Sequence, residues 1–252
     1  MYEKKVNLLG LKLDDLGVAG ACAAIEKRMK KGECTVVFTP NIEMLDAACK
    51  REALRHALRR ADILLPDGVG LKLVARILGV SLKNIAPGIE VGEGMLKISE
   101  RKGYRVFLLG TDVGVARLAK QRLKEIYPRL KVCGTYHGFF ENDDISKVCD
   151  MISGSRAEIL FVCMGFPKQE VFALRCAEHI PSLKLIMCLG GALDVWSGTK
   201  RRAPQILRDV HLEWLYRIAC EPKRLKRFLP SLAVLLKAVS YRAEKILSKE
   251  LR

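Results

Sequence analysis

Residues 104–127 read YRVFLLGTDVGVARLAKQRLKEIY, and this stretch decides the fold that we expect for the chain. Its first residues are mostly apolar, which predicts a short buried strand over residues 104–109. Gly110 follows this strand, and residues 113–127 then carry apolar side chains at helical spacing. A strand that leads through a glycine turn into a helix is typical of α/β proteins with a parallel sheet.

The same unit recurs along the chain. Short apolar runs predict further strands at residues 34–39, 62–65, 131–133, 158–163 and 185–189, and helical spacing follows them, first over residues 42–60. This alternation predicts a Rossmann-like parallel sheet with helices on both faces, which we assign to a core over residues 1–197. The alternation stops near residues 196–204, and we expect residues 198–252 to form a basic helical appendage.

Composition excludes several classes of protein. Half of the 252 residues are apolar, which is too many for a disordered chain. The nine cysteines form no Cys-x-x-Cys pair, and we recognise no signal peptide, so we expect reduced thiols and a cytoplasmic protein. The longest apolar stretch near the end, residues 229–241, is interrupted and falls short of the roughly 20 residues that a membrane span requires.

Positive charge is concentrated in the C-terminal segment. The net charge is +16, and residues 199–252 contribute +9 of it, with 14 Lys and Arg against 5 Asp and Glu. The arginines that we single out here are Arg201, Arg202, Arg217, Arg224 and Arg227. Nucleic acid, an anionic membrane and a phosphorylated ligand could each attract such a segment, whereas a solvated helical face needs no partner at all.

An apolar stripe favours the membrane among these partners. It consists of Leu232, Leu235, Leu236, Val239 and Leu247, flanked by lysines and arginines. A basic amphipathic helix is typical of membrane-surface elements, whereas we find no nucleic-acid recognition motif and few aromatic residues. We therefore expect peripheral attachment to the inner face of the cell membrane and no nucleic-acid partner. Because the stripe has no evident partner in the sequence, we also expect a mobile appendage and a homo-oligomer.

Candidate site residues follow the predicted strands, because ligands bind beyond the carboxyl ends of parallel strands. Polar residues and glycines gather at these places, and they include Thr39, Asn41, Asp67, Gly110, Thr111, Gly165, Lys168, Gln169, Gly190, Gly191 and Asp194. We expect these residues to line one crevice.

Each candidate also has a structural interpretation. Asp67, between Pro66 and Gly68, suits a general base or a turn aspartate that bonds its own backbone. Thr39 and Asn41 could line a binding pocket or form the N-cap of the next helix.

The remaining loop residues also allow two interpretations each. The loop from Gly110 to Gly114 suits phosphate binding or a plain turn, and Gly190 with Gly191 suits a ligand or close packing. Gln169 could donate a hydrogen bond to a sugar hydroxyl or simply be solvated.

Several kinds of site lack their motif. The four histidines, His56, His137, His179 and His211, have no metal-binding spacing, and we find no Gly-x-Ser-x-Gly, dinucleotide-binding or Walker A motif. No Asp-x-Asp is present to hold a divalent ion on a sugar nucleotide. We therefore expect neither a metal nor a cofactor, and arginines would have to neutralise a diphosphate leaving group.

Taken together, the motifs resemble a known family. Thr39-Pro40-Asn41, Pro66-Asp67-Gly68, residues 165–170 (GFPKQE), Gly190-Gly191 with Asp194, and Arg201-Arg202-Ala203-Pro204 stand in the order found in the WecG/TagA/CpsF family of bacterial glycosyltransferases. Glu213-Trp214, Arg217 and Pro222-x-Arg224 are also similar to that family, so that the resemblance covers nearly the whole chain. It implies an α/β fold of the GT-E type.

The resemblance also implies a reaction. It is strongest to the family's N-acetylmannosaminyltransferases, which implies transfer of N-acetylmannosamine from its UDP donor to undecaprenyl-diphosphate-linked N-acetylglucosamine in wall teichoic acid synthesis. The implied transfer inverts the anomeric centre and uses no metal. Asp67 falls on the family's general base, and Thr39, Asn41 and Gln169 fall on catalytic-pocket positions. Arg217, Arg224 and Arg227 lie in the appendage that closes over the diphosphate.

One segment departs from the family pattern. Ile85 stands where the family usually has Arg, and Glu90 where it usually has Asp. A related sugar, N-acetylmannosamine uronic acid or glucose, is therefore an alternative. The rival classes are a nucleotide-dependent oxidoreductase or methyltransferase and a non-enzymatic binder of lipid or nucleic acid.

Overall fold

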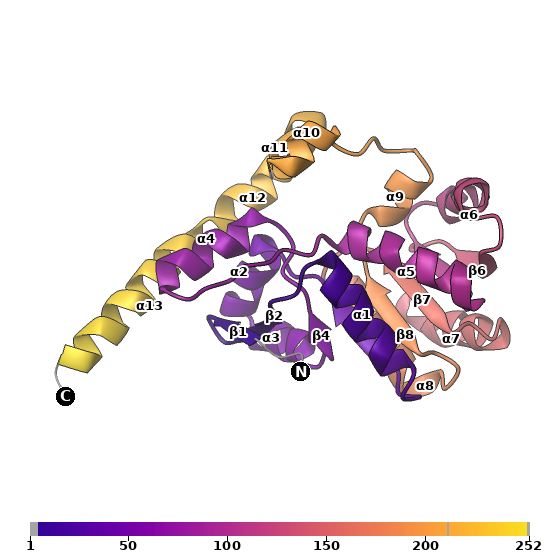
Figure 1. The fold of residues 1–252 in the computed structure, drawn as a ribbon, viewed down its shortest axis with the longest axis horizontal. Coiled ribbons are helices and arrows are strands. Elements are labelled where there is room, and N and C mark those ends of the chain that lie inside the picture. The colour runs from indigo at the N-terminus through magenta and orange to yellow at the C-terminus, as the bar shows by residue number, and fades with distance from the viewer. Residues whose placement is uncertain (1–4, 211, 251–252) are drawn as a thin grey trace.

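The computed structural model describes residues 5–210 and 212–250, without the side chains of Asn142, Arg224, Arg227 and residues 246–250. Six parallel strands form its central sheet, in the order β4-β3-β8-β7-β5-β6 (Figure 1). Their bounds are β3 Thr35–Phe38, β4 Ile63–Leu64, β5 Arg105–Gly110, β6 Lys131–Tyr136, β7 Ile159–Cys163 and β8 Leu185–Cys188. The parallel sheet confirms the fold class that the sequence predicts.

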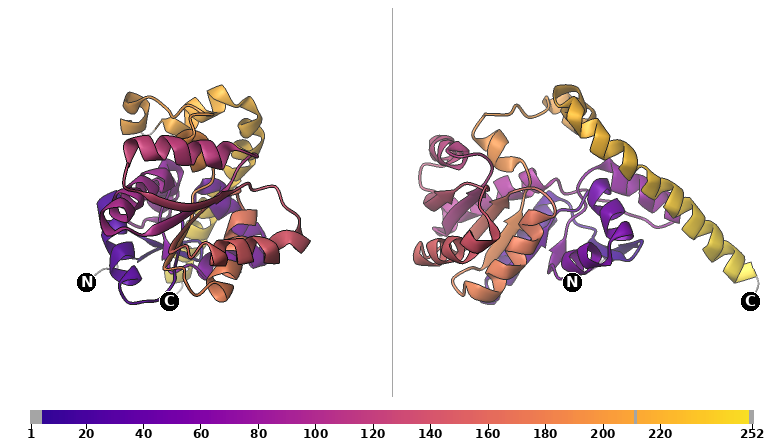
Figure 2. Two further views of the ribbon diagram at one scale, coloured as in Figure 1. Left: turned by 90° about the vertical axis from the view of Figure 1, so that its right-hand side faces the viewer. Right: turned by 180° about the vertical axis from the view of Figure 1, so that it is seen from behind.

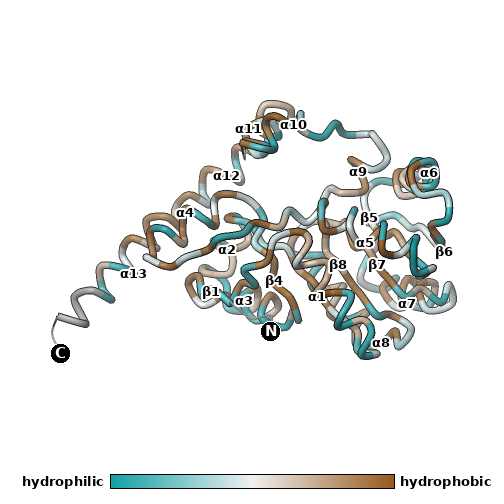
Figure 3. Tube along the Cα trace, viewed as in Figure 1, coloured by the Kyte–Doolittle hydropathy of each residue, from teal (hydrophilic) through white to brown (hydrophobic). Residues whose placement is uncertain are grey.

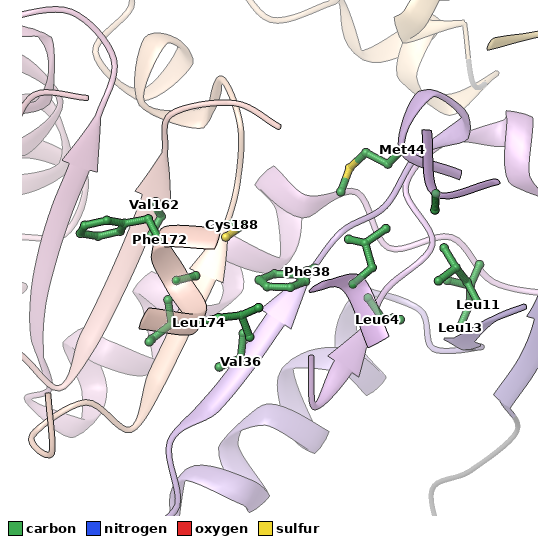
Figure 4. Packing of buried hydrophobic residues seen from close by; sticks show 14 of the residues in the cluster. Leu11, Leu13, Val36, Phe38, Met44, Leu64, Val162, Phe172, Leu174 and Cys188 are labelled. Atoms are coloured by element: carbon green, nitrogen blue, oxygen red, sulfur yellow. The ribbon is translucent and has the colours of Figure 1, made fainter. Parts of the chain in front are cut away.

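Helices cover both faces of the sheet, because successive strand residues point to opposite sides. Val36 and Phe38 pack on one side with Leu174 (Figure 4), whereas Val37 belongs to the core on the other side. The first side carries α2 Ile42–Lys50, α3 Glu52–Arg59, α4 Val69–Leu78, α7 Ile145–Gly154 and α8 Lys168–His179. The second side carries α1 Val18–Met29, α5 Gly88–Lys102, α6 Val115–Ile126 and α9 Ala192–Trp196. The predicted two-sided cover is confirmed.

Two local features differ from the prediction. An antiparallel hairpin, β1 Lys5–Leu8 and β2 Leu11–Asp14, precedes the first helix, and its buried and exposed residues alternate along both strands. The single helix expected over residues 42–60 is two helices, because Arg51 between them adopts an extended conformation. The Arg55 guanidinium donates to the carbonyl of Ala48 across 3.1 Å and so satisfies an acceptor at the end of α2.

The C-terminal segment is helical, as predicted. It contains α10 Gln205–Asp209, α11 Glu213–Cys220, a 3-10 turn η2 Pro222–Arg224, α12 Leu225–Ser231 and α13 Ala233–Glu250. Helix α13 runs along α4, as Figure 1 and the right-hand view of Figure 2 show. Figure 3 shows that hydrophobic residues dominate the strands, whereas α13 alternates between hydrophobic and hydrophilic residues.

The prediction that the apolar stripe lacks a partner is wrong for Leu235, which packs against the core together with its neighbours on α13. Val234 and Ala238 are buried in the same core as Val74 and Ala75 of α4. Lys237 donates to the carbonyl of Cys49 across 3.2 Å, which adds a polar tie to the end of α2. An amphipathic helix buries its apolar face wherever a matching face is available, and α4 supplies one.

The other residues of the apolar stripe differ in their exposure to solvent. Leu232 and Leu235 are half-buried, whereas Leu236 and Val239 are exposed, and the side chain of Leu247 lies outside the described residues. No helix within the described ranges combines the length and the apolar character that crossing a membrane requires. The boundary between residues 197 and 198 stays a prediction.

Candidate active site

Asp67 lies in the loop between β4 and α4, at the carboxyl edge of the sheet. Its backbone N–H donates to the carbonyl of Pro40 across 2.9 Å, which joins this loop to the loop after β3. Its carboxylate oxygen Oδ2 accepts from the backbone N–H of Gly88, the first residue of α5, across 3.4 Å. Asp67 thus reaches a segment 21 residues away rather than its own turn.

The surroundings of Asp67 change its acidity. Burial raises the pKa of the carboxyl to about 6, because water no longer stabilises its charged form fully. The positive charge of Arg217 and the Gly88 N–H lower the pKa, while the negative charges of Glu213 and Glu90 raise it. A carboxyl that titrates near neutral pH suits a general base. Arg217 belongs to α11, so the C-terminal segment contributes to the electrostatic environment of this carboxyl.

Thr39 packs against Gly88, the residue that donates to Asp67, and joins the ends of two strands. Its hydroxyl donates to the carbonyl of Cys188 at the end of β8 across 3.3 Å. Gly88 packs so closely against it that a methyl group there would come within 2.7 Å of the Thr39 oxygen. Asn41 instead adopts the capping role, since its Oδ1 accepts from the backbone N–H of Met44 across 3.0 Å at the start of α2.

Gln169 is buried at the start of α8 and joins two loops. Its Oε1 accepts from the backbone N–H of Gly165 across 3.2 Å and from that of Gly190 across 3.1 Å. Its Nε2 donates to the carboxylate of Glu170 across 2.8 Å. Burial excludes the interpretation of Gln169 as a solvated side chain, and its contact with a sugar hydroxyl stays a prediction. Gln169 holds the loops after β7 and β8 together.

The side chain of Lys168 also binds a loop of the protein. Its ammonium group donates to the carbonyls of Gly138 and Phe140, both across 3.0 Å, and lies 4.7 Å from the centre of the Phe140 ring. These contacts fix the loop after β6, at the same edge of the sheet. The predicted substrate-binding ammonium group therefore has protein partners.

Thr111 and Asp194 bring two further loops together. The Thr111 hydroxyl donates to Oδ1 of Asp194, and Lys200 lies 3.1 Å from Oδ2 of the same carboxylate. Gly110 precedes Thr111 at φ +136, and a methyl group there would overlap the carbonyl of Cys163. Only glycine permits this close approach of β5 and β7. Gly191 lies at the same edge, before α9.

The predicted arginines have different surroundings. Arg202 pairs with Glu90 across 2.7 Å, Arg217 pairs with Glu213 one turn earlier on α11, and Arg201 is exposed. The side chains of Arg224 and Arg227, like residue His211, lie outside the described residues.

Sequence reasoning missed two basic residues that lie near this edge. Lys200 bridges Asp194 and Glu221, and Arg208 lies 4.0 Å from Glu90. Their position in the same basic run as Arg201 and Arg202 was the available signal. Within the described ranges, no group of three His, Cys, Asp or Glu side chains is arranged to hold a metal ion, and the expectation of metal-free chemistry stays a prediction.

Fold and site together define a Rossmann-like α/β protein with a carboxyl group of raised pKa at the carboxyl edge of its sheet. The chain belongs to the WecG/TagA/CpsF family of glycosyl transferases, whose family model matches residues 6–247. It is therefore a glycosyltransferase, and the family resemblance is confirmed.

Two relatives carry the same name, N-acetylglucosaminyldiphosphoundecaprenol N-acetyl-beta-D-mannosaminyltransferase. The protein from Bacillus spizizenii (strain ATCC 23059 / NRRL B-14472 / W23) is 32% identical over 193 residues, which cover 77% of this chain and 74% of that protein. The protein from Staphylococcus aureus (strain MRSA252) is 30% identical over 244 residues, which cover 96% and 94%. This chain is thus similar to N-acetylmannosaminyltransferases over nearly its full length.

Proposed function

We propose that this chain transfers N-acetylmannosamine from UDP-N-acetylmannosamine to N-acetylglucosaminyl-diphosphoundecaprenol, a step of wall teichoic acid linkage-unit synthesis. The names of the two relatives support this substrate pair. The observation that carries the proposal is the Asp67 carboxyl, whose pKa of about 6 lies close to neutral and which has the charge of Arg217 near it.

The proposed mechanism starts at Asp67. In its charged form, this carboxylate takes the proton from the acceptor hydroxyl as that oxygen attacks the anomeric carbon of the donor sugar. The bond between the anomeric carbon and the phosphate oxygen breaks, and UDP leaves with the electron pair. Attack from the face opposite UDP inverts the anomeric centre. A general base in this position contributes about 10²- to 10⁴-fold in rate.

The leaving UDP needs positive charge, and the C-terminal segment supplies it in this proposal. The positive charge of Arg217 acts on the Asp67 carboxyl. Arg224 and Arg227 follow along the chain, in η2 and α12. A guanidinium group keeps its charge and matches two phosphate oxygens at once. The sequence has no Asp-x-Asp, so we propose that arginines replace a metal ion at the diphosphate.

We further propose that the C-terminal segment attaches the enzyme to the anionic inner face of the cell membrane. Leu229, Leu236 and Val239 expose 55%, 74% and 53% of their surfaces, and basic residues flank them. An exposed apolar row with basic flanks suits the headgroup region of a bilayer. In this arrangement the lipid-linked acceptor reaches the site without leaving the membrane. A homo-oligomer in the absence of lipid stays a prediction.

The test is a donor panel. Release of UDP is measured with UDP-N-acetylmannosamine, UDP-N-acetylmannosamine uronic acid and UDP-glucose, each with a short-chain lipid diphosphate N-acetylglucosamine acceptor. We expect release with the first donor only, and only when acceptor is present. A preference for either other donor would replace the proposed sugar, and no release with any of them would contradict the proposed reaction.

A further inference from the structure

A short linker joins the core to the C-terminal segment, and it carries two basic residues with several acidic partners. Residues 197–204 connect α9 to α10 (Figure 1), through turns up to Lys200 and without regular secondary structure over residues 201–204. Lys200 lies 3.1 Å from the carboxylate of Asp194 on α9 and 3.2 Å from that of Glu221, which follows α11. The backbone N–H of Lys200 also donates to the carbonyl of Asp194 across 3.0 Å.

Arg202 forms the second attachment. Its guanidinium nitrogen Nη2 lies 2.7 Å from Oε1 of Glu90, and Nη1 lies 3.6 Å from Oε2 of Glu93, so that one side chain holds two carboxylates of α5. The Arg202 side chain is only 13% exposed, and the following Ala203 is buried. Arg208 of α10 approaches the same Glu90 oxygen at 4.0 Å.

The pair of Arg202 and Glu90 connects two elements whose charges act on Asp67. Glu90 stands in the first turn of α5, the helix whose first residue, Gly88, donates to Asp67. On the other side, the linker leads through α10 to α11, which carries Arg217. The charges of both Glu90 and Arg217 act on the Asp67 carboxyl.

We infer that Arg202 is a positioning residue: through Glu90 it holds the C-terminal segment, which carries Arg217, against α5, the helix whose first residue donates to Asp67. This inference rests on the proposed function for the meaning of that site. It separates Arg202 from the arginines that bind the diphosphate, because its guanidinium group is already paired and largely removed from solvent. Removing one partner of such a pair leaves the other charge uncompensated, which costs more than the loss of an exposed pair.

The test uses Arg202→Met, Glu90→Gln and the double variant, each in the full chain. We expect each single variant to lower kcat by about 10²-fold, because a small misplacement of a catalytic group has an effect of that order. The KM for the UDP-sugar should change much less than kcat, because the negative charge that Arg217 is proposed to neutralise develops on UDP mainly as the bond breaks. The double variant should lose no more than either single variant, because both break the same attachment.

A second measurement follows the attachment without using activity. Trypsin cleaves after Lys200 and Arg201, which lie in the linker of the original chain and of all three variants. We expect faster cleavage there in the variants, with an unchanged melting temperature of the core. Glu178→Gln is the matched control, because Glu178 forms an exposed ion pair with Arg60 outside this linker, and it should change neither cleavage nor kcat.

Three results would overturn the inference. They are a raised donor KM with unchanged kcat in Arg202→Met, additive losses in the double variant, and linker cleavage as slow in the variants as in the original chain. Absence of UDP release by the original chain would instead contradict the proposed function, while the trypsin measurement would still decide whether Arg202 and Glu90 hold the segment in place.

Discussion

The backbone N–H of Gly88 donates to the Asp67 carboxylate across 3.4 Å and ties the loop after β4 to the first turn of α5. Gly88 also packs against Thr39 at the end of β3, and the Thr39 hydroxyl donates to the carbonyl of Cys188, so the start of α5 is joined to the ends of β3, β4 and β8. The contact turns the Asp67 carboxylate toward α5 and away from its own turn.

Asp67→Asn should remove transfer while leaving the fold intact. Asparagine keeps the shape and still accepts from Gly88, but it takes no proton from the acceptor hydroxyl. We expect kcat to fall by about 10²- to 10⁴-fold, measured by UDP release. Asp144→Asn serves as the control, since Asp144 pairs with Lys147 at the surface. Near-normal turnover by Asp67→Asn, with a normal melting temperature, would contradict the role of Asp67.

The rate should depend on pH through Asp67. Its pKa is raised to about 6, so kcat/KM should rise with pH through that value and level off above it. Arg217 lowers this pKa and Glu213 raises it. We therefore expect Arg217→Met to move the acid limb of the profile to higher pH and Glu213→Gln to move it to lower pH. Shifts of the same sign in both variants would assign the limb to another group.

Gln169→Leu should weaken the fold at the carboxyl edge of the sheet. The substitution leaves the half-buried N–H groups of Gly165 and Gly190 without their acceptor, and together they should cost about 1–3 kcal/mol, since one fully buried unsatisfied group already costs that much. Urea unfolding measures the loss in free energy of unfolding. Gln121→Leu on the exposed side of α6 is the control and should change it little. Equal stability of the two variants would show that the joined loops contribute nothing.

Gly88→Ala should disturb the contacts that Gly88 makes with Thr39 and Asp67. The added methyl group would lie 2.7 Å from the Thr39 oxygen, and overpacking of this kind costs about 1–3 kcal/mol. We expect lower stability and lower kcat, with partial recovery of stability alone when Thr39→Ala removes the obstructing oxygen. Gly154→Ala is a matched control, because a methyl group there meets no atom within 4 Å. Absence of recovery in the double variant would contradict this cause.

Glu170 should make the protein less stable as the pH rises. Burial raises the pKa of its carboxyl to about 7, so the folded state binds a proton that the unfolded state has already released above about pH 4.5. The free energy of unfolding should therefore fall between about pH 4.5 and 7, by up to about 3 kcal/mol from this group. Asp67 acts in the same direction, since its pKa is also raised.

Glu170→Gln tests this directly, because glutamine stays neutral at every pH. Chemical unfolding at pH 5 and at pH 8 should show a smaller difference in the variant than in the original chain. The gain in stability should appear at pH 8. A gain at pH 5 alone would have the wrong sign for a carboxyl of raised pKa.

Local sequence patterns determined the architecture. The alternation of apolar strands and helical spacing predicted all six strands of the parallel sheet and its two-sided cover. The motif around Asp67 placed a carboxylate at the correct edge. These features depend on neighbours within a few residues, which is why periodicity and turn residues reveal them. In the hairpin formed by β1 and β2, buried and exposed residues alternate along each strand. The strands are only four residues long, and the hairpin was not predicted.

Only the tertiary structure decided what the site side chains contact. Gln169 and Lys168 bond loops of other strands, Arg202 meets Glu90 from 112 residues away, and α13 covers α4. A sequence pattern shows that a side chain is polar or apolar and lies at a strand end. Its partner depends on which distant segments the packed core brings within hydrogen-bond distance, and no local spacing encodes that distance.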